Sequence, residues 1–310
     1  MDLRIVCEPQ QGATYNDILD LALATEAGGF DAFFRSDHYV KEGDVSGLPG
    51  PTDAWMTIAG LARDTKRLRI GTLLTAASFR LPGALSIAVA TVDIMSGGRV
   101  ELGLGAGWFE DEHVAYGIPY PPQRERFEKL EEQLAIIRGL WETEVGGLFT
   151  FSGKHYKLTD SPALPKPLQL PHPPLIVGGL GTLRTPRLAA RFADEFNVPY
   201  ASMQESRSQF ARVDDACREI GREPSSLIRS VAQVVCCGSS EQEVACRAMI
   251  IGRDVDELRE NAIAGTPAEV VHRIRAWSDI GVSRLYLQIV DMRDLDLVRL
   301  IAKDVVPTIG

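Results

Sequence analysis

The strongest constraint on this chain is a regular alternation of short apolar runs with longer amphipathic runs along its 310 residues. The apolar runs are typical of strands buried on both faces, and the amphipathic runs have the spacing of helices. Strands that alternate with helices form parallel sheets, and eight of them can close into a barrel. We therefore predict an α/β fold, a (β/α)8 TIM barrel formed by residues 1–310, rather than an open doubly wound sheet. The predicted strands are Leu3–Cys7, Phe30–Phe34, Leu68–Leu74, Val100–Leu104, Leu175–Val177, Phe196–Val198, Ile228–Cys236 and Arg284–Val290.

One segment, Thr143–Pro174, departs from this pattern because it is rich in proline and glycine. It is much longer than an ordinary barrel connection, which has roughly 2–6 residues. We expect an insertion over about residues 143–174 that crosses the C-terminal mouth of the barrel and lines a binding site. The alternative is a surface excursion with no role in binding.

Composition excludes several classes of partner. The net charge is −9 and the isoelectric point about 5.2, which argues against nucleic acid and anionic membranes as partners. No apolar run approaches the roughly 20 residues that span a bilayer, and the N-terminus does not resemble a secretion signal. The five cysteines are scattered and lack metal-ligand spacing. We expect a cytoplasmic protein without a catalytic metal.

The candidate site follows from a general property of parallel barrels, which place their sites at the C-terminal ends of the strands. The second predicted strand ends in Asp37 and His38, an acceptor beside an imidazole that titrates near neutral pH. We predict that these are catalytic residues. The alternative is a structural pair that holds a loop.

Two glycine-rich stretches follow the fourth and fifth predicted strands. Residues 105–107 carry little side-chain cover, which lets a flat ring approach the backbone, although glycine can also make a simple turn. Residues 178–182 precede a predicted helix, and backbone N–H groups in such a position can bind phosphate. Trp108, Phe109 and His113 come directly after the fourth strand, where they would either wall a ring-shaped ligand or pack the loop.

Several of these motifs resemble one known family, the bacterial luciferase-like flavin and deazaflavin enzymes. The resemblance runs through SDHY, GTLLT, ELGLGAGWFEDEHVAYGIP, SGKHYKL, PKPLQLPHPPLIVGGLG and GTPAEVVHRI, over nearly the whole chain. Within that superfamily the sequence looks closest to actinobacterial oxidoreductases that use the deazaflavin coenzyme F420. The resemblance implies a homodimer that acts on a small-molecule substrate.

The resemblance also implies roles for individual residues. His38 would be the proton donor or acceptor beside the ring, with Asp37 close by. A non-prolyl cis peptide behind the ring would lie at Thr72–Leu73. The residues implied to contact the cofactor are Asp37, Thr72, Leu73, Ala106, Gly107, Trp108, Asp111, His113, Gly178, Gly179, Gly181 and Thr182, the last four at its phosphate.

The chain departs from the related sugar-phosphate dehydrogenases at Trp108, where those enzymes carry an acid/base glutamate. This makes oxidation of a sugar phosphate an unfavoured reaction and suggests a flat, apolar substrate. We predict hydride transfer between F420 and a small organic substrate, a reaction in which the protein positions the cofactor and moves a proton. Two alternatives stay open: an FMN-dependent luciferase-like monooxygenase, and a barrel that binds a flavin without turning over a substrate.

Overall fold

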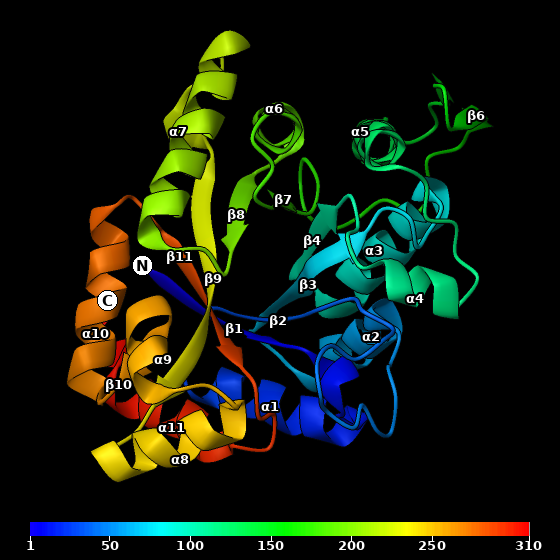
Figure 1. The fold of residues 1–310 in the computed structure, drawn as a ribbon. Coiled ribbons are helices and arrows are strands. Elements are labelled where there is room, and N and C mark those ends of the chain that lie inside the picture. The colour runs from blue at the N-terminus through cyan, green and yellow to red at the C-terminus, as the bar shows by residue number, and fades with distance from the viewer. Residues whose placement is uncertain (310) are drawn as a thin grey trace.

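The computed structural model describes residues 1–309, and it is a closed barrel of eight parallel strands surrounded by helices (Figure 1). Each strand pairs with the next one of the barrel, and β9 pairs with both β8 and β11, which closes the ring. The predicted (β/α)8 barrel is therefore confirmed. The barrel strands are β1 (Asp2–Cys7), β2 (Ala32–Arg35), β3 (Arg69–Ala76), β4 (Val100–Gly105), β7 (Leu175–Gly178), β8 (Glu195–Pro199), β9 (Ile228–Cys237) and β11 (Arg284–Ile289).

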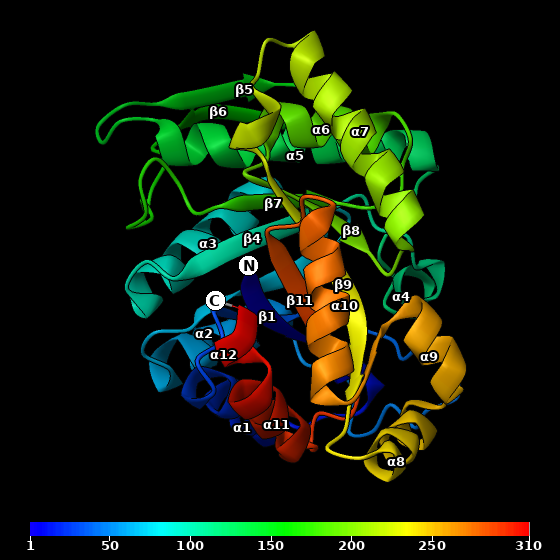
Figure 2. The same cartoon turned by 90° about the vertical axis from the view of Figure 1, so that its left-hand side faces the viewer.

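The helices cover the outside of this barrel (Figure 2). Side chains cap several of their ends: Thr14 and Asp17 form a capping box at the start of α1, and Asp53 caps α2. The helices are α1 (Tyr15–Ala27), α2 (Ala54–Asp64), α3 (Pro82–Ser96), α4 (Glu110–Ala115), α5 (Gln123–Glu142), α6 (Arg184–Phe192), α7 (Met203–Glu219), α8 (Glu241–Ile251), α9 (Val255–Asn261), α10 (Pro267–Asp279), α11 (Leu295–Asp304) and α12 (Val306–Ile309). No helix in the described part of the chain is long and apolar enough to cross a membrane.

The interior of the barrel is layered, because alternate residues of each strand point inward. At the N-terminal end, Arg4, Glu101 and Glu195 form a buried charged layer. Above it lies an apolar layer, formed by Val6, Ala32, Phe34, Ile176, Ala232 and Tyr286. The C-terminal end above that layer is left for polar side chains.

The proline-rich segment does not lie where we expected it. A two-stranded antiparallel hairpin, β5 (Phe149–Ser152) and β6 (Lys157–Ser161), packs on α5, the helix that precedes it (Figure 2). Phe149, Phe151 and Leu158 contact the apolar side of α5 at Ile136 and Leu140, and burial of these side chains holds the hairpin on the outer wall.

The end of that segment then returns to the N-terminal side of the barrel. The carboxylate of Asp93 accepts hydrogen bonds from the backbone N–H groups of Leu168 and Gln169 and from the side-chain amide of Gln169. Pro174, directly before β7, accepts a hydrogen bond from the backbone N–H of Leu102 in β4. Residues 143–174 all fall within the described chain, and none of them lines the cavity at the mouth. The expected crossing of the mouth was therefore wrong.

Two further small elements escaped prediction. After β9 the chain forms α8, which the helical spacing of residues 241–250 predicts, and then α9 and the short strand β10 (Ile263–Gly265), which were not expected; β10 pairs with the last residues of β9. Val234, Cys236 and Ala264 belong to a separate small apolar cluster beneath α8 and α9. β10 therefore lies beside the end of β9, just past Val234, where the pairing of β9 with β11 stops.

Candidate active site

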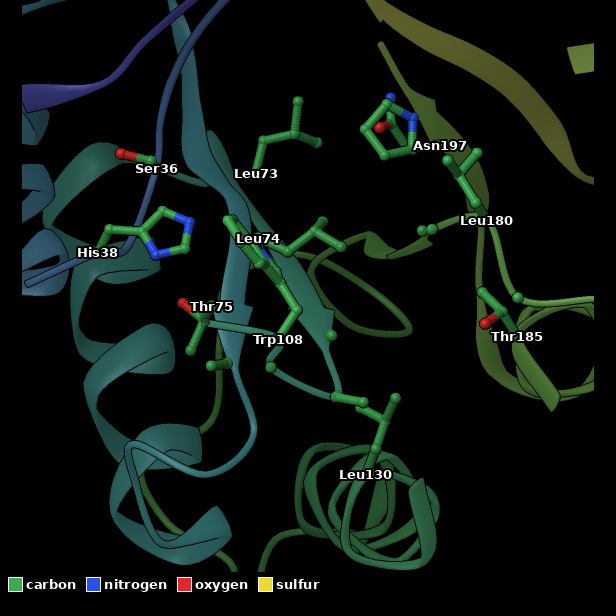
Figure 3. Close-up of a pocket in the computed structure, with 18 of the residues that line it drawn as sticks. Ser36, His38, Leu73, Leu74, Thr75, Trp108, Leu130, Leu180, Thr185 and Asn197 are labelled. Carbon is green, nitrogen blue, oxygen red and sulfur yellow. The ribbon is translucent and has the colours of Figure 1, made fainter. Parts of the chain in front are cut away.

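A cavity of about 620 Å³ opens at the C-terminal mouth of the barrel. Its walls come from the ends of β1, β2, β3, β4, β7 and β8 and from α4 and α5. In Figure 3, His38 lies on one side, Leu180 and Thr185 lie on the opposite side, and Leu73 and Leu74 lie between them. Its lining includes Glu8, His38, Glu42, Leu73, Leu74, Ala106, Gly107, Trp108, Glu112, Arg126, Gly178, Gly179, Leu180, Gly181, Thr185 and Tyr200.

His38 is held by a carboxylate from another element. Its Nδ1 lies 3.1 Å from both oxygens of Glu112, a residue of α4 that is almost completely buried. A carboxylate only accepts hydrogen bonds, so Nδ1 carries a hydrogen and Nε2 is left for the cavity. The same carboxylate accepts a hydrogen bond from the backbone N–H of Tyr39, at 2.9 Å, which fixes it in place.

The acidic surroundings of His38 change its proton affinity. Burial of the imidazole opposes protonation, but the hydrogen bond and charge of Glu112, together with the charges of Glu42 and Glu8, outweigh it. The pKa of His38 is therefore raised above its ordinary value of 6.5. His38 therefore stays protonated to a higher pH than a free imidazole.

A second group of polar side chains faces His38 within the cavity. Burial, and then the neighbouring charge of Glu42, raise the pKa of Glu8 above its usual value. The hydroxyl of Tyr200, which follows β8, is a hydrogen-bond partner of Glu8. The Tyr200 side chain is partly exposed, but its hydroxyl end is buried, and this burial together with the Glu8 carboxylate raises the pKa of Tyr200 well above 10. The side of the cavity around His38 is thus rich in carboxylates and proton donors.

The opposite side of the cavity is a backbone surface made by glycine. A Cβ added at Gly178 would lie 2.7 Å from the carbonyl oxygen of Asn197, and one at Gly181 would collide with the Thr185 hydroxyl. Gly179 has φ of +131°, a conformation that side chains rarely adopt. The next helix, α6, begins here with no side-chain cap, so its first N–H groups are available to a ligand. This arrangement fits a phosphate, as the sequence suggested.

Ala106 and Gly107 form a narrow strip of wall at the end of β4. Gly107 has φ of +78°, and a Cβ there would lie 3.0 Å from the Ser78 hydroxyl and 3.3 Å from Ala76. Trp108 follows with 62% of its surface exposed; its indole stacks on Phe109 at 5.2 Å between ring centroids. The ring of His38 meets the indole edge-on, at 5.7 Å. Bare backbone beside exposed aromatic rings suits a flat ligand.

Asp37 lies behind the cavity rather than in its lining. Its carboxylate is almost completely buried, where it accepts a hydrogen bond from Thr75 at 2.8 Å and forms an ion pair with Arg80. Arg80 also binds Asp53 at 2.6 Å. Because strand residues alternate in direction, the neighbour of an inward-facing His38 points into the surrounding wall.

Four other predicted contacts also lie outside the lining. Thr72 is completely buried and donates to the carbonyl of Gly103, at 3.1 Å. His113 is completely buried between the Ser78 hydroxyl and the Phe109 carbonyl, both at 2.7 Å. Asp111 and Thr182 are exposed on the surface. The remaining seven predicted contacts all line the cavity: Leu73, Ala106, Gly107, Trp108, Gly178, Gly179 and Gly181.

The cis peptide bond is one residue further along the chain than we expected. It joins Leu73 to Leu74 rather than Thr72 to Leu73, in the part of β3 where the pairing with β4 shifts register between Thr72 and Thr75. Two identical leucines follow each other here, so sequence alone does not distinguish the positions. Both leucines, and then Thr75, line the cavity.

Sequence reasoning missed Glu8, Glu42, Glu112 and Tyr200. Glu8 could have been found, because it follows β1 and shares the inward face of Arg4 and Val6. Glu112 had no comparable signal, since α4 is a short helix within a loop. Among the residues that the structure describes, no group of three or more His, Cys, Asp or Glu side chains could hold a metal ion.

Comparison with known proteins gives a consistent result. A family model described as luciferase-like monooxygenase matches residues 2–255. The F420-dependent glucose-6-phosphate dehydrogenase of Microbacterium testaceum is 32% identical over 210 residues, which cover 67% of this chain and 60% of the dehydrogenase. The match thus spans less than two thirds of that relative's own length.

Two solved structures share the fold over the whole chain. An F420-dependent secondary alcohol dehydrogenase, in complex with an F420-acetone adduct, has a TM-score of 0.84 at 19% identity and covers 100% of this chain and 99% of its own. The monooxygenase RslO1 from Streptomyces bottropensis has a TM-score of 0.81 at 23% identity, with 100% of both chains covered. At these identities the likeness concerns the fold.

Proposed function

Because this chain belongs to the luciferase-like monooxygenase family, we propose that it is an F420-dependent oxidoreductase that transfers hydride between the deazaflavin and a small organic substrate. The observation that carries this proposal is the arrangement of the cavity, with a glycine-lined phosphate cradle on one side and a carboxylate-held histidine on the other. The names of the related dehydrogenase and the structural neighbour support the choice of cofactor.

The residues of the cavity fit such a group. Gly178, Gly179 and Gly181, with the N-terminus of α6, would hold its phosphate through backbone N–H groups. Gly178 and Gly181 have no room for a side chain, and Gly179 has a positive φ, so this bare backbone is specific to glycine. Ala106 and Gly107 would lie along the ring system. When bound, a deazaflavin supplies the hydride chemistry, and the protein supplies binding, orientation and proton management.

His38 would manage the proton. Glu112 holds Nδ1–H and orients the ring, which leaves Nε2 to exchange a proton with a group in the cavity. The raised pKa of His38 keeps it protonated to a higher pH than a free imidazole. We expect it to donate in the direction of substrate reduction and to accept in the direction of oxidation.

A cofactor titration tests the proposal directly. The purified protein is titrated with F420 and, separately, with FMN, and the binding is followed by the fluorescence of each cofactor. We expect F420 to bind at least about tenfold more tightly, a difference of about 1.4 kcal/mol. Tight binding of FMN alone would overturn the assignment in favour of the flavin-dependent monooxygenase.

The role of His38 is tested by His38→Ala. We expect turnover with reduced F420 to fall by about 100-fold or more, the usual size of a general acid–base contribution, while the Kd of F420 stays within about threefold. His272→Ala, on α10 and outside the cavity lining, is the control and should match the parent protein. Normal turnover by His38→Ala would remove His38 from the mechanism.

A homodimer and a cytoplasmic location remain part of this proposal. The five cysteines are free in the structure, four of them buried and Cys246 exposed, an arrangement that suits a reducing compartment. Sedimentation velocity measures the oligomeric state, and fractionation of the source cells measures the location.

A further inference from the structure

The charges that line the cavity are unbalanced. Three carboxylates face it, those of Glu8, Glu42 and Glu112, against one permanently charged cation, Arg126. Within the described chain, Glu112 forms an ion pair with His38, whereas Glu8 and Glu42 form none. The hydrogen-bond partners of Glu42 are neutral: its carboxylate accepts from the Gln10 amide at 3.5 Å and its own N–H donates to Gln11. The charges of Glu42 and Glu8 also act on His38, but that imidazole is already paired with Glu112.

Arg126 does not compensate these carboxylates. Its guanidinium donates to the carbonyl oxygens of Gly107, at 3.3 Å, and Pro121, at 2.7 Å. It also lies over the ring of Tyr120, 4.0 Å from the ring centroid. These contacts hold the cation at the start of α5, so the negative charge of Glu8 and Glu42 is left to the contents of the cavity.

Leaving such charges without a partner is costly in a partly desolvated site. Glu8 shows the cost in its raised pKa, which burial and the charge of Glu42 cause. A positively charged ligand would relieve both carboxylates at once. An anionic ligand would instead meet like charges there, so the two ligand types should differ strongly in affinity.

The aromatic side chains of the cavity are a second, independent feature that favours a positively charged ligand. Trp108 and Tyr200 both line the cavity and are 62% and 47% exposed, so their rings can contact a ligand. Tryptophan is the best cation–π partner among the side chains, and aromatic faces combined with carboxylates are the usual means of binding substituted ammonium groups. Neutral apolar substrates would use the rings but not the carboxylates.

We propose that the substrate side of this cavity, formed by Glu8, Glu42, Trp108 and Tyr200, selects an organic cation such as a substituted ammonium or iminium compound. The inference rests on the proposed function only in assigning the glycine side of the cavity to the cofactor. It differs from the apolar substrate that the sequence suggested, because Glu8 and Glu42 were not then recognised as lining residues. It agrees with the expectation that a sugar phosphate is an unfavoured substrate, since the carboxylates would repel it.

Calorimetric titration with two matched probes tests this. Choline carries a quaternary ammonium group, and 3,3-dimethylbutan-1-ol has the same shape with a carbon in place of the charged nitrogen. We expect choline to bind about tenfold more tightly than the uncharged alcohol to the protein saturated with F420, and glucose 6-phosphate to bind more weakly than either. Equal binding of choline and the alcohol, or tighter binding of glucose 6-phosphate, would overturn the proposal.

Variants assign the preference to the carboxylates. In Glu8→Gln/Glu42→Gln the preference for choline should fall to about threefold or less. Glu110→Gln, which neutralises an exposed carboxylate of α4 outside the lining, should keep it. Thermal unfolding of both proteins checks that they remain folded, and a preference retained in the double variant also contradicts the proposal.

The F420 titration runs in parallel and separates the two claims. Failure of F420 to bind, with the choline preference intact in the free protein, overturns the proposed function alone. Normal F420 binding with no choline preference overturns the cation site alone. Quenching of tryptophan fluorescence by choline gives a further readout that is independent of turnover, and it should disappear in Trp108→Phe.

Discussion

The two ends of the barrel are built on the same strands but handle charge in opposite ways. At the N-terminal end, Arg4 pairs with Glu101 at 2.6 Å and with Asp31 at 2.7 Å, while Arg284 pairs with Glu195 at 2.6 Å. At the C-terminal end, Glu8 and Glu42 have no cationic partner among the described residues. Arg4 and Glu8 lie four residues apart, on the same face of one strand and its extension.

This difference separates the end of the barrel whose charges stabilise the fold from the end whose charges can bind a ligand. The hydroxyl of Tyr286 links the buried charges by accepting from Arg4 at 2.9 Å and donating to Glu195 at 2.8 Å, which completes the network. Such a network does not bind a charged ligand, because its charges are already paired with one another. The C-terminal mouth can bind one, because its carboxylates are in excess over its cations.

Breaking the N-terminal network should have the largest effect. In Arg4→Met the buried carboxylates of Glu101 and Glu195 lose a shared cation, and we expect the free energy of unfolding to fall by about 3–5 kcal/mol. Denaturant unfolding followed by circular dichroism measures this. The Kd of F420 should not change.

Arg299→Met is the matched control, because its side chain is 66% exposed and pairs only with Asp296 on the same helix. It should leave stability nearly unchanged, as exposed ion pairs generally contribute little. The separation of the two ends would be contradicted if Arg4→Met lost as little stability as Arg299→Met, or if its affinity for F420 changed greatly.

At the mouth, the largest effect should come from Glu112→Gln. Burial lowers the proton affinity of His38 and Glu112 restores it, so the variant should bring the pKa of His38 down toward or below 6.5. A step that needs protonated His38 loses rate as pH rises through this pKa, so the alkaline limb of the pH–rate profile should move to lower pH. Loss of a hydrogen bond to a charged group, worth about 1.5–3 kcal/mol, should lower kcat by about tenfold or more.

The same change should be visible in stability. Because the folded pKa of His38 is above its unfolded value of about 6.5, the pair stabilises the fold fully below that pH and less as pH rises through the folded pKa. This pH dependence should weaken in Glu112→Gln and persist in Glu110→Gln, on the same helix. An unmoved pH–rate profile would show that Glu112 does not position His38.

The smallest predicted effect concerns the glycine side of the cavity. Gly179→Ala places a side chain at φ of +131°, where strain of about 1–3 kcal/mol is usual, so we expect F420 to bind about tenfold more weakly. The control is Gly221→Ala, at φ of +74° with no atom near its Cβ and outside the lining. It should lower stability but leave the Kd of F420 unchanged; a parallel loss of affinity would mean that strain acts through the whole fold.

Much of the fold was predictable, because strand and helix spacing are local properties of the sequence. The eight predicted strands are the example, since each overlaps one of the barrel strands. The Thr143–Pro174 segment was not predictable, because its path depends on apolar contacts with α5 rather than on its own composition. Long-range packing of this kind leaves no period in the sequence.

The position of the candidate site was predictable from the sequence, but several of the residues that form it were not. His38, Trp108 and the glycines at 178–181 line the cavity because they end barrel strands. Asp37 adjoins His38 in sequence but faces the opposite way, toward Arg80, and adjacency gave no hint of that. Glu112 comes from a separate helix and meets His38 only through the folded chain.

The closed ring of parallel strands also divides the site along the chain. His38 and the three cavity carboxylates come from residues 8–112, whereas the glycine cradle comes from residues 178–185. Under the proposed function, proton transfer would depend on the first half of the polypeptide and phosphate binding on the second, while Ala106, Gly107 and Tyr200 would bring each half into contact with the other's ligand. Joining the first half of this barrel to the second half of another family member should change what reacts while keeping how the cofactor is tethered, which makes recombination between half-barrels a practical route to new activities.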